Sequence, residues 1–201
     1  MQILAIYGSN YGQAEKVLKR IVGILEGRGH VVSVYKGDTV PADVGVEDFD
    51  AVVIAASIAV GRYQDYIKQF VLRHLAVLRT RPTAFISVNG ANPESKPEWQ
   101  AEARRYVEQF RQDTGWEPRW TATFSGALRF RRYGLVTRWI MKMISRQHGG
   151  PTDTSQDYEF TDWVAVDRFG ADLATELATG PSADLATNPA QSPADRPPER
   201  L

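Results

Sequence analysis

The chain has 201 residues, 43% of them hydrophobic, a length that suits one α/β domain and is short for two. Its 24 basic and 24 acidic residues balance, so the overall charge favours no nucleic-acid partner. Because cysteine is absent, disulfides, thiolate catalysis and thiolate-bound metals are excluded, and the three separated histidines lack metal-ligand spacing, so no metal site is predicted.

The first 126 residues alternate between short β-branched apolar runs and longer segments of helical period, which is typical of βα units on a parallel sheet. Five strands are predicted, and they cover residues 3–7, 31–35, 51–56, 84–88 and 121–124. Four helices are predicted from the spacing of apolar residues, and they run from Ala14 to Leu25, Tyr66 to Leu78, Trp99 to Phe110 and Trp163 to Leu177. Segment 36–50 shows little helical period and is expected to be loop or a short helix.

These elements predict one domain over residues 1–178, with an insertion at about residues 127–160. Residues 179–201 are rich in Ala, Pro, Asp, Thr and Arg, and we expect them to form a disordered tail. The amino terminus lacks the features of a signal peptide, and no apolar run approaches the ~20 residues that cross a bilayer. The sequence therefore predicts a cytoplasmic protein and leaves open attachment to one membrane face.

The junction of the first strand and first helix, Gly8 to Ala14, has the composition of an anion-binding turn. Small and hydroxyl residues before a helix present free backbone N–H groups and the positive end of the helix dipole, which favour a phosphate. The spacing matches neither the dinucleotide fingerprint nor the nucleoside-triphosphate P-loop. A simple capped helix start is the alternative.

This turn resembles the phosphate loop of flavodoxins, in which a Ser or Thr begins the turn and a glycine precedes the helix. The resemblance implies an α/β three-layer sandwich with a parallel sheet in the order 2-1-3-4-5, helices on both faces and FMN at the carboxyl edge of the sheet. It also implies that the loops after the third and fourth strands hold the isoalloxazine, and that Tyr11 or Tyr63 stacks on the flavin or lines its edge, unless it is a packing residue. The FMN-binding residues expected on this basis are Ser9, Asn10, Tyr11, Gly12, Gln13, Ala14, Ser57, Ile58, Ala59, Gly61, Arg62, Tyr63, Asn89, Gly90 and Ala91.

Later segments resemble one branch of that fold, the flavodoxin-type, quinone-dependent protoporphyrinogen IX dehydrogenases of haem biosynthesis. The resemblance covers residues 2–178, and the segments that carry it are 55–58, 61–63, 85–89, 125–130, 141–143, 149–154, 158 and 161–163. The chain departs from the family at Ala14, where a hydroxyl residue is usual, and at Asn10-Tyr11. Loss of one phosphate hydrogen bond there is expected to weaken FMN by on the order of 1 kcal/mol.

The resemblance implies oxidation of protoporphyrinogen IX by FMN, with electrons passed to a membrane quinone, menaquinone or ubiquinone. This reaction requires no protein nucleophile, and the sequence identifies no catalytic base. Oligomeric state is not predicted, and a homo-oligomer is left open.

The insertion is expected to contain a helix with one apolar side, formed by Leu135, Val136, Trp139, Ile140, Met143 and Ile144. Basic residues lie near or on this helix, and they are Arg129, Arg131, Arg132, Arg138, Lys142 and Arg146. No acidic residue occurs between Glu117 and Asp153, so an external anionic partner is expected, either lipid headgroups or porphyrin propionates. The alternative is a solvated basic face on a helix that packs against the sheet.

Three other functions are compatible with the sequence. An electron-carrier flavodoxin is the first, although such carriers tend to be acidic and this chain is neutral. An FMN-dependent quinone reductase is the second, and no nicotinamide site is identifiable. A binding module that has lost FMN is the third, and the retained Ser9 and Gly12 disfavour it.

Overall fold

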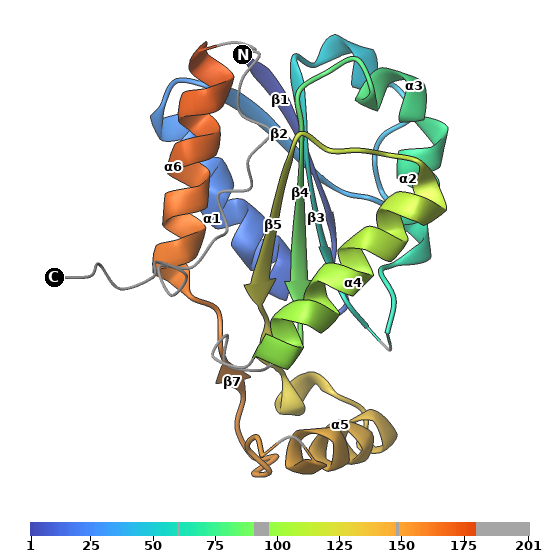
Figure 1. Ribbon diagram of the computed structural model, residues 1–201, viewed down its shortest axis with the longest axis vertical. Coiled ribbons are helices and arrows are strands. Elements are labelled where there is room, and N and C mark those ends of the chain that lie inside the picture. The colour runs from blue at the N-terminus through green and yellow to red at the C-terminus, as the bar shows by residue number, and fades with distance from the viewer. Residues whose placement is uncertain (60, 91–96, 148, 180–201) are drawn as a thin grey trace, which may run out of the picture.

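A five-stranded parallel sheet lies at the centre of the fold, in the order β2-β1-β3-β4-β5 (Figure 1). The computed structural model describes residues 1–59, 61–90, 97–147 and 149–179. The strands are β1 (Gln2–Gly8), β2 (Val31–Lys36), β3 (Ala51–Ser57), β4 (Thr83–Asn89) and β5 (Trp120–Ser125). All five predicted strands and the predicted strand order are confirmed.

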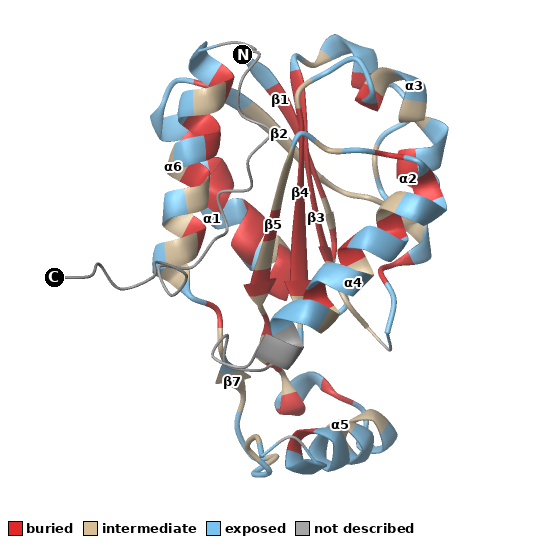
Figure 2. Cartoon of the chain, viewed as in Figure 1, coloured by how far each residue is buried: buried red, intermediate tan, exposed pale blue. Residues whose placement is uncertain are grey.

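Helices cover both faces of the sheet. On one face lie α1 (Gln13–Gly27) and α6 (Trp163–Thr179), and on the other lie α2 (Asp65–Arg73), α3 (Leu75–Leu78) and α4 (Pro97–Thr114). Because successive strand residues point to opposite faces, Ile3 and Ala5 pack towards α1 while Leu4 and Ile6 pack towards α2. The three central strands β1, β3 and β4 are buried along most of their length (Figure 2), which explains their continuous hydrophobicity.

The structure refines two of the predicted connections. The helix predicted between Tyr66 and Leu78 is interrupted at His74, whose φ of −107° is not helical. Segment 36–50 contains only the short 3₁₀ helix η1 (Val46–Asp48), which agrees with its weak helical period. Thr179 still belongs to α6, and the rest of the predicted tail lies outside the described residues.

The insertion forms a small separate unit at the carboxyl end of the strands, below the arrowheads of β4 and β5 in Figure 1. It contains β6 (Ala127–Leu128), η2 (Phe130–Arg132), α5 (Leu135–Gln147) and β7 (Tyr158–Glu159). The antiparallel pair β6–β7 brings its two ends together, an arrangement that the sequence did not reveal because two-residue strands have no periodicity. Leu128, Phe130 and Tyr133 form its own buried cluster.

Glu159 connects the insertion to the main domain. Its carboxylate accepts hydrogen bonds from Lys16 Nζ at 2.8 Å, Arg129 Nη2 at 3.1 Å and Trp163 Nε1 at 2.8 Å. Burial alone raises the pKa of this carboxyl, but Lys16, Trp163 and Arg129 together hold it below its ordinary value of 4.5. The charged form therefore stabilises the junction of α1, β6–β7 and α6.

We expect Glu159→Gln to lower the free energy of unfolding by about 1 kcal/mol at neutral pH. The effect is modest because the ion pairs of Glu159 with Lys16 and Arg129 are partly exposed to solvent. A depressed carboxyl pKa contributes stability above the ordinary pKa, and this contribution disappears as the pH falls through the folded-state value. The difference from wild type should thus narrow below a pH of about 4.5. Denaturant unfolding at neutral pH and below pH 4.5 measures the difference in free energy of unfolding between variant and wild type. Glu26→Gln, at an exposed residue, is the control. A difference that does not change with pH would contradict this role.

Candidate functional site

The turn between β1 and α1 has the backbone geometry of an anion-binding loop. Gly12 immediately precedes α1 with a φ of +89°, a left-handed conformation that glycine adopts without strain. Its N–H donates to Ser9 Oγ at 2.9 Å, which holds the loop closed. No side chain caps α1, so the first N–H groups of the helix and its dipole face the loop.

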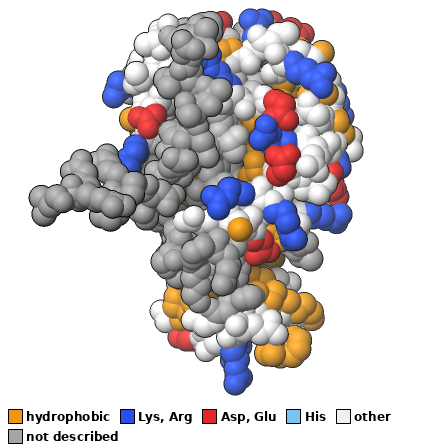
Figure 3. All heavy atoms as spheres, in the orientation of Figure 1, with side chains coloured by type: hydrophobic (Ala, Val, Ile, Leu, Met, Phe, Trp, Pro, Cys, Tyr) orange, Lys and Arg blue, Asp and Glu red, His pale blue; other side chains and the backbone are white. Residues whose placement is uncertain are grey.

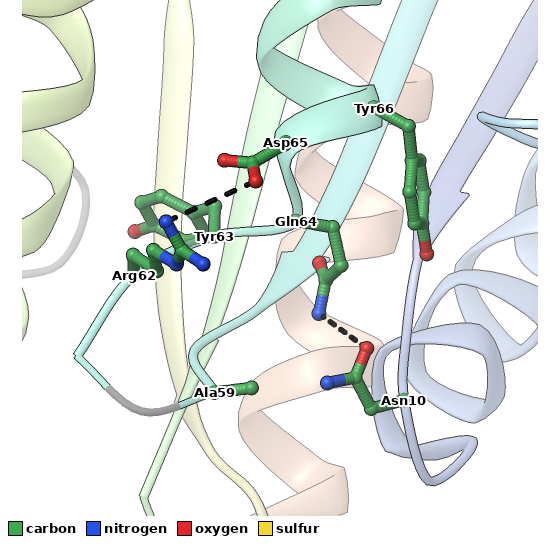
Figure 4. Close-up of a pocket in the computed structure, with 7 residues that line it drawn as sticks. All are labelled: Asn10, Ala59, Arg62, Tyr63, Gln64, Asp65 and Tyr66. Atoms are coloured by element: carbon green, nitrogen blue, oxygen red, sulfur yellow. Dashed lines mark hydrogen bonds and ion pairs between the residues drawn. The ribbon is translucent and has the colours of Figure 1, made fainter.

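Two residues of the β3–α2 region secure this turn from the side. Gln64 Nε2 donates to Asn10 Oδ1 at 3.3 Å (Figure 4). It also donates to Ser57 Oγ at 3.1 Å, and Tyr66 Oη accepts from Ser9 N at 3.2 Å. A Cβ at Gly8 would lie 2.6 Å from Gln64 Oε1. Only glycine at this position therefore leaves room for the Gln64 side chain to reach Asn10 and Ser57. The phosphate loop is thereby tied to the end of β3.

A cavity of about 330 Å³ opens beside these contacts. Its lining comes from the phosphate loop, the β3–α2 loop and the start of α2, and consists of Asn10, Ala59, Arg62, Tyr63, Gln64, Asp65 and Tyr66 (Figure 4). Its size falls in the range of small-molecule sites, and polar and aromatic side chains converge on it.

A hydrogen-bond chain orients Asn89 at the end of β4. Tyr63 Oη lies 2.7 Å from Ser87 Oγ, and Ser87 Oγ donates to Asn89 Oδ1 at 2.7 Å. The Ser87 hydroxyl has one proton, which it donates to Asn89, so the Tyr63 hydroxyl must be the donor to Ser87. Burial keeps the phenol protonated because it raises the pKa of Tyr63 far above its usual range. Asn89 Nδ2 is buried without a hydrogen-bond partner among the described residues. An amide donor is therefore available at this edge.

Both tyrosines expected near the flavin make packing contacts with other aromatic rings. Tyr63 is 8% exposed, and its ring packs edge-on against Phe85 at 5.3 Å and Phe110 at 5.0 Å. Tyr11 is half-buried and its ring contacts Tyr133 edge-on at 4.6 Å. Tyr11 thus packs against the insertion.

Most of the other expected residues lie at or next to the same carboxyl edge. Gln13 is buried, donates to Thr161 Oγ1 at 2.8 Å and accepts from Arg129 Nη2 at 2.7 Å. Ala14 is fully buried in the core. The others follow β3 and β4, namely Ile58, Ala59, Gly61, Arg62 and Gly90, while Ala91 lies outside the described residues.

The basic residues of the insertion do not form one surface. Arg129 is paired with Glu159 and Asp157, and Arg138 is half-buried and donates to the Tyr133 carbonyl at 3.2 Å. Arg132 lies at the phosphate loop, where its Nη1 donates to the Tyr11 carbonyl at 3.3 Å. The exposed basic residues elsewhere in the insertion are Arg131, Lys142 and Arg146.

The apolar side of α5 is exposed, which disagrees with the alternative of a helix that packs against the sheet and leaves only a solvated basic face. Leu135 is 83% exposed and Trp139 is 65% exposed, and the other large apolar side chains in contact with solvent are Val136, Ile140, Met143 and Ile144. The inner side of α5 instead contributes Met141 and Ser145, which pack against the rest of the insertion. Figure 3 shows hydrophobic side chains gathered at this end of the molecule.

The residues at this edge fit FMN. The turn at Gly12 suits a phosphate, Gly8 leaves space for the Gln64 contact, and the unpartnered Asn89 amide suits a polar ring edge. Sequence reasoning missed Gln64 and Tyr66, which stabilise the loop from 54 and 57 residues away. Their only sequence signal is their place after the loop of the third strand.

Comparisons with known proteins identify the family. The flavodoxin domain model matches residues 4–155. A protoporphyrinogen IX dehydrogenase [quinone] of Escherichia coli K12 is 31% identical over 176 residues, covering 87% of this chain and 95% of that protein. One from Leishmania major is 29% identical, covering 85% of this chain and 74% of that protein.

Among solved structures, a Streptococcus pneumoniae TIGR4 flavodoxin has a TM-score of 0.51 at 15% identity, with coverage of 89% of this chain and 99% of that one. This likeness supports the fold. Together with the match to residues 4–155 and the 31% identity over most of both chains, it shows that the chain belongs to the flavodoxin-domain family and, within it, to the quinone-dependent protoporphyrinogen IX dehydrogenases.

Proposed function

We propose that the protein oxidises protoporphyrinogen IX to protoporphyrin IX with FMN and passes the electrons to a membrane quinone, menaquinone or ubiquinone. The observation that carries this proposal is the 31% identity to the Escherichia coli protoporphyrinogen IX dehydrogenase, which extends over 95% of that protein. The carboxyl edge of the sheet, with its glycine turn and oriented Asn89 amide, supports FMN as the cofactor.

When bound, FMN supplies the redox chemistry. The N–H groups at the start of α1 and the hydroxyl of Ser9 bind its phosphate, and Gln64 holds this turn against Ser57. Tyr63 and Ser87 fix the Asn89 amide, whose Nδ2 has no hydrogen-bond partner among the described residues and would be the donor to the ring. The remaining ring contacts are expected from the backbone of the described residues that follow β3 and β4, namely Ile58, Ala59, Gly61 and Gly90.

Anaerobic turnover tests the proposal. FMN-loaded protein is mixed with protoporphyrinogen IX and a soluble quinone, and porphyrin fluorescence is followed against a heat-inactivated control. We expect porphyrin to form only in the presence of the active protein and quinone. Formation no faster than in the control would refute the haem-pathway activity and favour an electron-transfer flavodoxin or a quinone reductase.

The exposed face of α5 supports attachment to an anionic membrane surface. None of the described helices is both long and apolar enough to cross a bilayer. The apolar face defined by Leu135, Trp139 and their neighbours has Lys142 and Arg146 along its flank, and no acidic residue between Glu117 and Asp153. An apolar helix face bordered by cations suits the interface of an anionic bilayer. Docking there would bring the flavin edge next to the quinone.

We expect Trp139→Gln to weaken binding to vesicles that contain phosphatidylglycerol by about fivefold, because a large apolar side chain no longer enters the interface. The double variant Lys142→Glu/Arg146→Glu should remove the preference for anionic over neutral vesicles. Val164→Gln, at a 69% exposed apolar residue of α6, is the matched control and should bind normally. Vesicle sedimentation measures all three.

Two results would contradict membrane docking. One is a wild-type protein that does not sediment with anionic vesicles. The other is a wild-type dimer in analytical ultracentrifugation that Trp139→Gln converts to monomer, since the α5 face would then be an interface between two copies of the chain.

A further inference from the structure

The guanidinium of Arg132 lies directly beside the phosphate loop, although it comes from the insertion more than one hundred residues later in the chain. Its Nη1 is 3.3 Å from the Tyr11 carbonyl and would be 3.4 Å from a Cβ at Gly12. Gly12 immediately precedes α1, whose first N–H groups form the anion-binding end of the helix. The Arg132 guanidinium is thus placed at the positive end of that helix.

Buried aromatic residues fix the short turn that contains Arg132. Phe130 is fully buried and Tyr133 is 6% exposed, so the residues on both sides of Arg132 are anchored. Tyr133 packs edge-on against Tyr11 of the phosphate loop, and its hydroxyl accepts from Arg129 N at 3.1 Å. The position of Arg132 beside Gly12 is therefore built into the packing of the insertion and does not depend on its own side-chain contacts.

The charge of Arg132 is uncompensated within the described part of the chain. Arg129, on the same segment, is paired with Asp157 and Glu159, whereas no ion pair of Arg132 is present among the described residues. Among the described residues the guanidinium makes one hydrogen bond, to a neutral carbonyl, and its other N–H donors have no partner there. A cation beside a helix amino terminus repels the helix dipole unless an anion lies between them.

We propose that Arg132 binds the FMN phosphate and makes the site select FMN over the unphosphorylated riboflavin. This inference rests on the proposed function, because it assigns a residue to the same flavin site. The guanidinium supplies charge-assisted donors that the buried Ala14 side chain lacks. The insertion then has two roles, since it also closes the phosphate end of the flavin site.

The test compares affinities for two flavins that differ only in the phosphate group. Apoprotein is titrated with FMN and with riboflavin, and quenching of flavin fluorescence gives each Kd. We expect Arg132→Ala to weaken FMN about tenfold and to leave riboflavin unchanged, and Arg132→Lys to fall between wild type and Arg132→Ala. Arg131→Ala removes the same charge from the same turn and should leave both affinities unchanged. Added salt should weaken FMN less in Arg132→Ala than in wild type.

Equal FMN affinity of wild type and Arg132→Ala would overturn the proposal. So would an equal loss of FMN and riboflavin, because Arg132 would then support only the shape of the loop. Failure of the wild-type protein to bind FMN is a different result, which would refute the proposed function itself.

Discussion

Gly12→Val is expected to weaken FMN binding by about thirtyfold, which corresponds to about 2 kcal/mol. Gly12 has a φ of +89°, where a β-branched side chain is strongly disfavoured, and its backbone sets the direction of the first N–H groups of α1. The variant loop is expected to relax to an unstrained conformation that no longer directs these groups at the phosphate. FMN would then have to restore the strained conformation. Flavin fluorescence titration measures the loss.

Gly29→Val provides the matched control. Gly29 also has a positive φ, of 86°, and no atom lies within 4 Å of the position of its Cβ, but it follows the opposite end of α1. Both variants are expected to lose similar thermal stability through backbone strain, and only Gly12→Val should lose FMN. Normal FMN affinity in Gly12→Val would mean that the flavin phosphate binds elsewhere.

Phe130→Ala is expected to detach the insertion from the main domain. Phe130 is fully buried, and its ring packs against Tyr133 and Tyr158 in the cluster that holds the insertion together. Removing a buried phenylalanine side chain typically costs about 3–5 kcal/mol, which is enough to unfold a unit of this size locally. We expect limited proteolysis to cleave the variant between residues 129 and 157 while the five-stranded sheet stays folded.

Phe110→Ala separates this local effect from a general one. Phe110 belongs to the main core between the sheet and α4, so its loss should lower the melting temperature of the whole domain. Phe130→Ala should leave the main transition close to that of wild type and weaken vesicle binding. If both variants lowered the melting temperature of the whole domain by a similar amount, the insertion and the main domain would unfold as one unit.

The sequence predicted the fold well because its strongest signals are local. Strands buried on both faces appear as continuous apolar runs, such as Ile3 to Ile6, and α1 has a clear apolar stripe. No periodic pattern in the sequence predicts the helix break at His74 or the β6–β7 pair, because both depend on tertiary contacts. The strand order itself came from the resemblance to flavodoxins.

The site was predicted less completely, for a physical reason. The phosphate turn is local in sequence, whereas Gln64, Tyr66 and Arg132 reach it from distant segments. The apolar spacing of α5 is the same whether the helix packs on the sheet or faces solvent, and only the structure shows Trp139 exposed. Likewise an aromatic residue at a helix start can stack on a ligand or pack in the core, and the ring contacts of Tyr63 with Phe85 and Phe110 are seen only in the structure.

The most direct test of the account is a titration of the wild-type apoprotein with FMN. We expect saturable quenching of flavin fluorescence with one FMN bound per chain, and a yellow protein with flavin absorbance after gel filtration. A protein that stays colourless and leaves the fluorescence of FMN unchanged would contradict the claim that the turn between β1 and α1 binds the phosphate of this cofactor.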